Sequence, residues 1–225
     1  MPGAAQAAVT GLILAAGSGE RLDHESKAFL PWRGEPLLAH AIAKMTPICA
    51  TILVGLRGPD IERAEPLLQQ ASREHGRLVK AVAGGPARRD TLLNLLGHAH
   101  EEWVLLHDVA RPFTEASLFS DVLAAAMEHG AASAGFHPRV RDGLAEHVDG
   151  FIDRVVPQSS VVSMQTPQAC RTEWLRTALR DDTPALLREH SVAALLRAHG
   201  HPVKIVSGSQ ENVKITYPED LQLLR

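Results

Sequence analysis

Apolar runs and amphipathic stretches alternate along this chain, and the alternation predicts strands and helices in turn. Strands are predicted at residues 9–14, 50–54, 78–83, 103–107 and 131–136, with closing strands at 202–206 and 213–216. Helices are predicted at residues 36–45, 60–75, 92–99, 115–129, 171–180 and 184–198, with a final helix at 218–224. Continuously apolar strands such as 103–107 are typical of a parallel sheet covered by helices on both faces. The predicted fold class is therefore α/β, with ligands at the carboxyl ends of the strands.

One segment, residues 138–157, breaks this rhythm because it is charged and carries turn residues. The turn signals at 141–143 and 149–150 favour a protruding hairpin over a piece of the core. We therefore predict an arm at 138–157, and a contact with a partner is favoured over a solvated loop. Apolar residues return after the arm at 161–164.

The first predicted strand runs into a loop of small side chains: Ala15, Ala16, Gly17, Ser18 and Gly19. Glycines let a backbone approach a ligand closely, and successive N–H groups in such a turn bind anionic oxygens. Arg21 and Lys27 follow, and both cations are expected to face the loop. The loop lacks the Lys-Ser/Thr pair of a P-loop, and Leu22 stands where a dinucleotide-binding turn needs a small residue. A different phosphate-binding loop is favoured, and an ordinary turn with two exposed cations is the alternative.

A second flexible turn follows the strand predicted at 78–83 and opens a helix. It contains Gly85, Arg88 and Thr91. A helix N-terminus with glycine before it and arginine beside it favours an anion or the polar edge of a base. The alternative is a plain capped helix start.

Two further candidates are an acidic residue and a lysine. Asp108 follows the strand predicted at 103–107, where a carboxylate suits Mg²⁺ that bridges phosphate oxygens. A structural ion pair between Asp108 and Arg111 is the other interpretation, and the two are compatible. Lys214 lies inside an apolar strand pattern, and spacing alone does not decide whether it faces water or the site.

Length and charge narrow the range of functions. The 225 residues suit one large α/β domain, and no linker divides residues 1–225. The net charge of −3 argues against nucleic-acid binding, and the apolar runs are too short to span a membrane. Without a signal-peptide pattern before the first strand, a cytoplasmic protein is expected.

Cysteine and histidine usage does not point to a metal site. Cys49 and Cys170 are isolated in the sequence, so neither a disulfide framework nor a zinc site is implied. His98 and His100 form the tightest histidine cluster, but no carboxylate or cysteine stands beside them at ligand spacing.

Six motifs occur in order along the chain: LILAAGSGERL, KAFL, GGPARRDT, HDVARPF, QTPQ and ENVKITYPEDL. Their order and intervals resemble those of the 2-C-methyl-D-erythritol 4-phosphate cytidylyltransferases, nucleotidyltransferases of the non-mevalonate isoprenoid pathway. The resemblance spans nearly the whole chain. It implies a three-layer α/β/α, Rossmann-like nucleotidyltransferase domain with a mixed sheet, in which the 138–157 arm mediates a homodimer. It also implies transfer of CMP from CTP to the 4-phosphate of the polyol, with Mg²⁺ or another divalent cation.

The resemblance carries roles to matching positions. The residues implied to line the nucleotide are Ala15, Ala16, Gly17, Gly19, Gly85, Arg88 and Thr91. Catalytic roles fall on Arg21, Lys27 and Lys214, of which the first two neutralise the triphosphate and Lys214 positions the attacking phosphate. Substrate-positioning roles fall on Asp108, Arg111, Gln158, Thr166 and Lys214, and Asp108 is also the implied metal ligand.

Several positions depart from the family pattern. The loop lysine is flanked by Ser26 and Ala28 where the family has Pro and Gln. Gly143 stands where a substrate-contacting Thr is common, and Gln158 stands where an Arg normally reaches the acceptor phosphate. A glutamine can hydrogen-bond phosphate but cannot neutralise it. The acidic motif before the penultimate helix is not clear, and residues 188–190 are its nearest match.

These departures leave two alternatives beside the leading interpretation. One is a cytidylyltransferase that acts on another polyol phosphate, such as ribitol 5-phosphate. The other is a protein that binds CTP without turnover.

Overall fold

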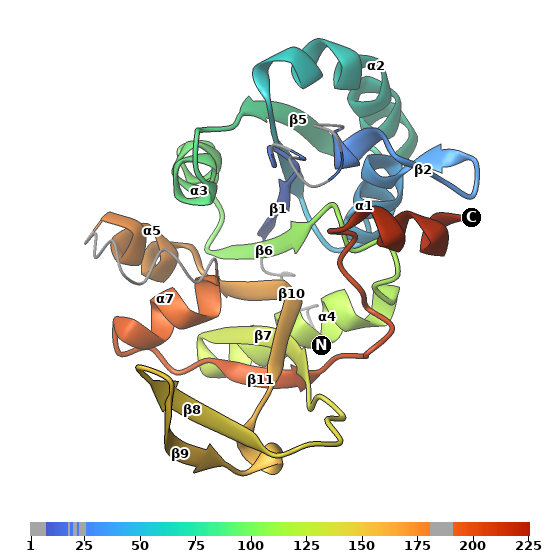
Figure 1. Cartoon of the computed structure of the whole chain (residues 1–225). Coiled ribbons are helices and arrows are strands. Elements are labelled where there is room, and N and C mark those ends of the chain that lie inside the picture. The colour runs from blue at the N-terminus through green and yellow to red at the C-terminus, as the bar shows by residue number, and fades with distance from the viewer. Residues whose placement is uncertain (1–7, 18, 20–21, 23–25, 181–190) are drawn as a thin grey trace.

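The computed structural model describes residues 8–17, 19, 22, 26–180 and 191–225, and a seven-stranded sheet forms its centre (Figure 1). The sheet has the order β11-β7-β10-β6-β1-β4-β5. Its strands are β1 (Val9–Leu14), β4 (Thr51–Leu56), β5 (Leu78–Ala83), β6 (Trp103–Asp108), β7 (Ala131–Phe136), β10 (Ser163–Arg171) and β11 (Lys204–Ser207). β1 is parallel to β4 and β6, and β4 is parallel to β5. The carboxyl ends of these four strands therefore meet at one edge of the sheet.

The sheet is mixed, because β10 runs antiparallel to both β6 and β7. The parallel sheet that the apolar runs indicate is therefore wrong for β10, and the mixed sheet that the family resemblance implies is confirmed. Burial explains the error: residues 165–170 of β10 are buried like those of its parallel neighbours, so the apolar pattern does not reveal the direction of the strand.

Helices cover both faces of the sheet. α1 (Leu37–Met45), α2 (Gly58–His75) and α4 (Ala116–His129) share one apolar core with Ile13 of β1. α3 (Arg88–Leu96), α5 (Thr172–Arg180) and α7 (Val192–Ala198) share a second core with Leu12 and Leu14. Successive side chains of a strand point to opposite faces, so β1 feeds both cores. The predicted three-layer α/β/α arrangement is confirmed (Figure 1).

Several predicted boundaries shift. α3 begins at Arg88 instead of residue 92, because the Asp90 carboxylate accepts a hydrogen bond from the Ala87 N–H and caps the helix start. Residues 213–216 form no strand. The final helix, η4 (Pro218–Leu224), is a 3₁₀-helix. Of the helix predicted at 184–198, residues 184–190 lie outside the described residues, and α7 covers 192–198.

The predicted arm is a hairpin of β8 (Leu144–Val148) and β9 (Phe151–Val156), which projects from the lower end of the molecule in Figure 1. A short 3₁₀-helix, η3 (Gln158–Ser160), follows it at the base of the arm. A second small hairpin pairs β2 (Pro31–Trp32) with β3 (Glu35–Pro36). Within the described parts of the chain, no helix combines the length and the apolar character needed to cross a membrane.

Candidate active site

A cavity of about 900 Å³ opens where the carboxyl ends of β1, β4, β5 and β6 meet. It brings together most of the residues singled out in the sequence. The predicted residues that line it are Ala15, Ala16, Gly17, Gly19, Lys27, Gly85, Arg88, Thr91, Asp108 and Lys214. Arg21 lies outside the described residues.

Small residues form the floor of the cavity because two loops cross there at close range. The Ala15 N–H donates to the carbonyl of Gly55 at 2.9 Å, which ties the loop to β4. A Cβ placed on Gly84 would lie 2.4 Å from the Cβ of Ala16, too close for any larger residue. Gly19 has φ of 67°, a left-handed conformation that glycine adopts without strain. The loop after β1 and the turn after β5 therefore pack with bare backbone toward the cavity.

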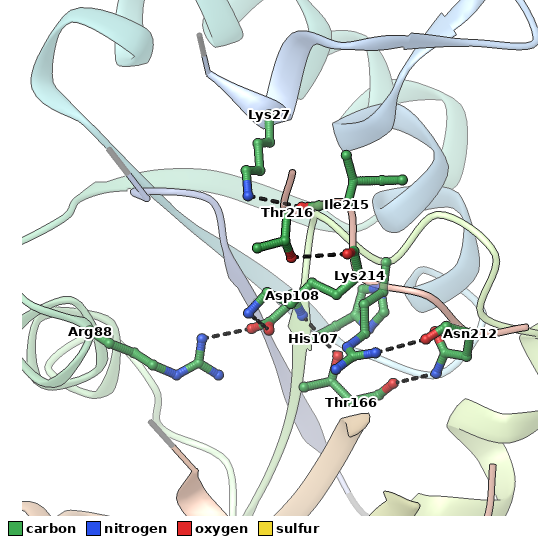
Figure 2. Close-up of polar contacts among 10 residues, drawn as sticks. Lys27, Arg88, His107, Asp108, Thr166, Asn212, Lys214, Ile215 and Thr216 are labelled. Atoms are coloured by element: carbon green, nitrogen blue, oxygen red, sulfur yellow. Dashed lines mark hydrogen bonds and ion pairs between the residues drawn. The ribbon is translucent and has the colours of Figure 1, made fainter. Parts of the chain in front are cut away.

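Thr91 and Arg88 hold the other side of the turn after β5. The Thr91 hydroxyl, which is buried, accepts a hydrogen bond from the Gly85 N–H at 3.1 Å. Arg88 is the first residue of α3, where the helix N-terminus favours negative charge. Its guanidinium extends across the cavity to Asp108 (Figure 2).

Asp108 is the centre of a charged cluster (Figure 2). One carboxylate oxygen accepts from Arg88 Nη1 and the other from Lys214 Nζ, each at 2.7 Å. Burial alone would raise the pKa of Asp108, but the Arg88 and Lys214 charges hold it well below its usual range. Asp108 is therefore ionised and fixes one cation on each side.

Lys214 is carried by an irregular segment that we call the strap, residues 209–216. Buried Asn212 anchors the strap: its amide donates to the Thr166 carbonyl at 3.0 Å, and its side-chain oxygen accepts from the Thr114 hydroxyl at 2.7 Å. The Ile215 N–H donates to the Ala110 carbonyl at 2.8 Å. The strap is thus held by these individual hydrogen bonds instead of by pairing with a strand. They bring Lys214 over β6 (Figure 2).

Lys27 approaches from the opposite end of the chain. It begins the 3₁₀-helix η2 (Lys27–Phe29), in which Ala28 is fully buried. Its ammonium donates to the Ile215 carbonyl at 2.8 Å, next to Lys214 (Figure 2). Lys27 and Lys214 therefore converge on one cavity although 187 positions separate them in the sequence (214 − 27).

Arg111 and Thr166, predicted to position substrate, do not line the cavity. The Arg111 guanidinium donates to the Asn212 carbonyl at 2.7 Å, and burial lowers the pKa of Arg111. The Thr166 hydroxyl accepts from the Asp108 N–H at 3.2 Å and lies 3.2 Å from Nδ1 of His107. Arg111 therefore supports the strap, and Thr166 supports the end of β6.

Gln158 also lies outside the cavity. It belongs to η3 at the base of the arm, is exposed, and donates from its side-chain amide to the Val140 carbonyl at 2.5 Å. In this arrangement its amide braces the arm.

Three residues to which the sequence motifs assign no role lie at the site in the structure. Arg57 and Thr216 line the cavity, and Asn212 anchors the strap. Arg57 directly follows β4, so the rule that ligands lie at strand ends was a usable signal for it. Asn212 has no such signal, because its partners are distant in the sequence.

The donors around the cavity do not form a metal site of the protein alone. Asp108 is the carboxylate among the described lining residues, and both of its oxygens are bonded to cations. Within the described residues, no group of three His, Cys, Asp or Glu side chains is placed to hold a metal. Mg²⁺ in nucleotide sites is held largely by phosphate oxygens and water, with one or two carboxylates. The cavity fits Mg²⁺ only as a companion of a bound triphosphate.

Comparison with known proteins agrees with this geometry. The sequence model of the 2-C-methyl-D-erythritol 4-phosphate cytidylyltransferase family matches residues 9–224. A protein of that name from Aquifex aeolicus is 34% identical over 217 residues, which cover 96% of this chain and 95% of the relative. A crystal structure of the Thermus thermophilus protein of the same name is 34% identical, with a TM-score of 0.71 and 97% of each chain covered. A synthase structure from Anaerococcus prevotii, 21% identical with a TM-score of 0.78 over 97% of each chain, shares the fold.

Proposed function

This chain belongs to the 2-C-methyl-D-erythritol 4-phosphate cytidylyltransferase family, and we propose how its side chains carry out the reaction of that family. The enzyme transfers CMP from CTP to 2-C-methyl-D-erythritol 4-phosphate in isoprenoid biosynthesis. The products are 4-diphosphocytidyl-2-C-methyl-D-erythritol and pyrophosphate.

The acceptor needs no general base. The second pKa of a phosphate monoester is about 6, so the attacking phosphate oxygen is already largely ionised at neutral pH. The oxygen attacks the α-phosphorus of CTP, the bond from that phosphorus to the bridging oxygen breaks, and the electron pair leaves with pyrophosphate. The barrier lies in bringing two polyanions together and in stabilising the in-line transition state. Positioned cations are therefore what the site must supply.

The observation that carries the proposal is the convergence of Lys27 and Lys214 on one cavity floored by bare backbone. CTP lies along the loop after β1, whose small residues admit the phosphates, with its base and ribose near Gly85 and Thr91. Lys27 neutralises charge that develops at the α-phosphorus.

The acceptor phosphate binds on the Asp108 side of the cavity. Asp108 binds Arg88 with one carboxylate oxygen and Lys214 with the other, each at 2.7 Å. Both cations are therefore positioned before substrate arrives. Lys214 then orients the attacking oxygen, which avoids an ordering cost at the moment of reaction.

Mg²⁺ enters the proposal as a companion of CTP. When bound to triphosphate oxygens it would neutralise charge on the nucleotide, and Asp108 is the nearest candidate for a protein ligand or for a carboxylate that acts through water. The steps assigned to Lys27 and Lys214 do not depend on where the metal sits.

The enzyme acts as a cytoplasmic homodimer in this proposal. Four apolar arm residues are 60–80% exposed: Val148, Phe151, Ile152 and Val155. Clustered exposed apolar side chains of this size mark an interaction surface, and a second copy of the chain presents a matching one. The buried free thiols of Cys49 and Cys170 suit a reducing compartment.

Pyrophosphate release tests the proposal. The full chain is assayed with CTP, Mg²⁺ and 2-C-methyl-D-erythritol 4-phosphate, and then with ATP, UTP or GTP in place of CTP and ribitol 5-phosphate in place of the acceptor. Turnover is expected with CTP and the methylerythritol phosphate and is expected to fall on chelation of Mg²⁺. Faster release with ribitol 5-phosphate, or CTP binding without release, would refute the assigned acceptor or the assigned activity.

A further inference from the structure

Arg57 is a cation at the cavity to which neither the motifs nor the family resemblance assigns a role. It is the residue between β4 and α2, at the carboxyl edge of the sheet. It lines the cavity, and its side chain is 30% exposed. A long, flexible cation at this edge is in reach of ligand and of water.

A buried carboxylate holds Arg57 in place. Nε of Arg57 donates to Asp60 Oδ2 at 2.7 Å, and the Asp60 side chain is only 8% exposed. The Asp60 N–H in turn donates to the Arg57 carbonyl at 2.9 Å. Burial alone would raise the pKa of Asp60, but the hydrogen bond from Arg57 and the nearby charge of Arg63 hold the pKa below its ordinary value. Asp60 is therefore ionised and orients the guanidinium.

The helix that carries Asp60 also contacts the segment that begins at Lys27. Arg63, one turn further along α2, lies 4.0 Å over the ring of Phe29 in η2. The first turns of α2, next to Arg57, therefore contact η2, which begins at Lys27.

The strand order places Arg57 away from the acceptor cations. The order β6-β1-β4 puts the glycine loop after β1 between Asp108, at the end of β6, and Arg57, after β4. In an in-line displacement the attacking and departing oxygens lie on opposite sides of the phosphorus. If the acceptor phosphate binds beside Asp108, the leaving group departs toward β4.

We infer that Arg57 binds the outer phosphates of CTP and stabilises pyrophosphate as it leaves, an inference that rests on the proposed function. The planar guanidinium presents several N–H donors in a fork that matches phosphate oxygens, and one of its nitrogens is used to fix its orientation through Asp60. Arg57 is thus a catalytic residue on the leaving-group side, opposite Lys214.

Binding of inorganic pyrophosphate to the full chain, measured by calorimetry, tests this without requiring turnover. Arg57→Gln is expected to weaken pyrophosphate binding about tenfold and to leave CMP binding unchanged, since CMP lacks the outer phosphates. Arg57→Lys keeps the charge but not the planar fork, so its pyrophosphate affinity is expected to lie between those of the wild type and Arg57→Gln. Arg73→Gln removes the same charge from an exposed position in the last turn of α2 and is expected to change neither affinity.

Unchanged pyrophosphate affinity in Arg57→Gln, with melting temperature maintained, would overturn the inference. An equal loss of CMP affinity would also overturn it, because Arg57 would then contact the base or the α-phosphate. If Arg57→Gln unfolds, Arg57→Lys decides by the same two affinities. The two proposals can fail separately. If the chain releases no pyrophosphate from CTP and the acceptor but still binds pyrophosphate through Arg57, the proposed function fails and the anion site remains.

Discussion

In the cavity, the charged side chains are paired with groups of the same chain, whereas the large apolar side chains of the arm are exposed. Asp108 is 5% exposed and bonded to two cations, while Phe151 at the turn of the arm is 80% exposed. A buried polar group that lacks a hydrogen-bond partner destabilises the fold. The charged groups of the cavity therefore take up their paired positions as the chain folds. The described part of the chain leaves the large apolar side chains of the arm uncovered.

This difference separates two kinds of function. The chemistry of the cavity should respond to single side chains with little change in assembly. Substitutions in the arm should change assembly and acceptor binding first and leave the CTP site intact. The predictions below test that separation, from the largest expected effect to the smallest.

Removing the Lys27 ammonium should have the largest effect. Loss of one preorganised charge at the transition state costs about 3 kcal/mol, or roughly a hundredfold in rate, so Lys27→Ala should reduce kcat/KM by at least that factor. Steady-state pyrophosphate release measures the loss, and circular dichroism checks that the fold is kept. Lys27→Arg serves as the matched control that keeps the charge. Near-normal activity of Lys27→Ala would contradict the assigned role.

Removing the side-chain amide of Asn212 should have the next largest effect. Asn212→Ala removes the donor to the Thr166 carbonyl and one of the two partners of the Thr114 hydroxyl, which keeps the Arg111 carbonyl at 3.0 Å; the cost is about 1–3 kcal/mol of stability. Because Asn212 anchors the strap, we expect kcat to fall about tenfold while KM for CTP changes little, since a displaced Lys214 affects the transition state.

Val203→Ala, in the connection before β11, controls for a general loss of packing on the opposite face of the sheet. If both variants lose stability and activity in proportion, Asn212 has only a structural role.

Buried His107 predicts how stability depends on pH. Burial lowers the pKa of His107 to about 3 in the fold, although the charge of neighbouring Asp108 opposes this shift. A histidine in the unfolded chain has a pKa of about 6.5. The stability from neutral His107 is fully present above the unfolded pKa. It falls as pH drops toward the folded pKa, because the unfolded chain takes up the proton first.

The slope of this loss approaches about 1.4 kcal/mol per pH unit below pH 6. Urea unfolding at pH 7, 6 and 5 measures it, and His107→Gln, which does not titrate, should show a shallower slope. Equal slopes for the two proteins would show that His107 is accessible to protons in the fold.

The part of the cavity made by local sequence could be predicted before the structure. The loop at 15–19, the turn with Gly85 and the acid at the end of β6 all follow from an apolar run that stops at small or polar residues. Arg57 obeys the same rule and was missed because it carries no known motif. The arm was predicted because its composition breaks the α/β rhythm.

The long-range part could not be predicted. Asn212 bonds to Thr166 and Thr114, and no local pattern encodes a contact across 46 or 98 positions. Residues 213–216 have a strand-like pattern because Ile215 is buried, yet the strap bonds to a loop instead of a ladder. Arg111 was assigned to substrate from the motif, and only the fold reveals its bond to the strap.

Charging the arm should change assembly more than the CTP site. Phe151→Asp places a carboxylate in the exposed apolar surface of the hairpin, which should prevent association with a second copy. We expect the mass from light scattering to change from dimer to monomer, with KM for CTP within about twofold of wild type. Asp153→Asn, a polar change at an exposed position of β9, is the control. A monomeric wild-type chain would contradict the proposed homodimer.

Placing an arginine at Gln158 should have the smallest effect. This substitution lies at the base of the arm but is expected to act on substrate binding, so it tests both regions at once. Gln158 hydrogen-bonds the Val140 carbonyl at the base of the arm and carries no charge, whereas the family resemblance implies an arginine here that contacts the acceptor phosphate. Gln158→Arg adds a charge-assisted contact for that phosphate, so KM for the acceptor should fall about threefold while KM for CTP stays constant. Gln158→Lys tests charge without the planar fork. If acceptor KM rises instead, bracing of the arm by the Gln158 amide contributes more to acceptor binding than charge does.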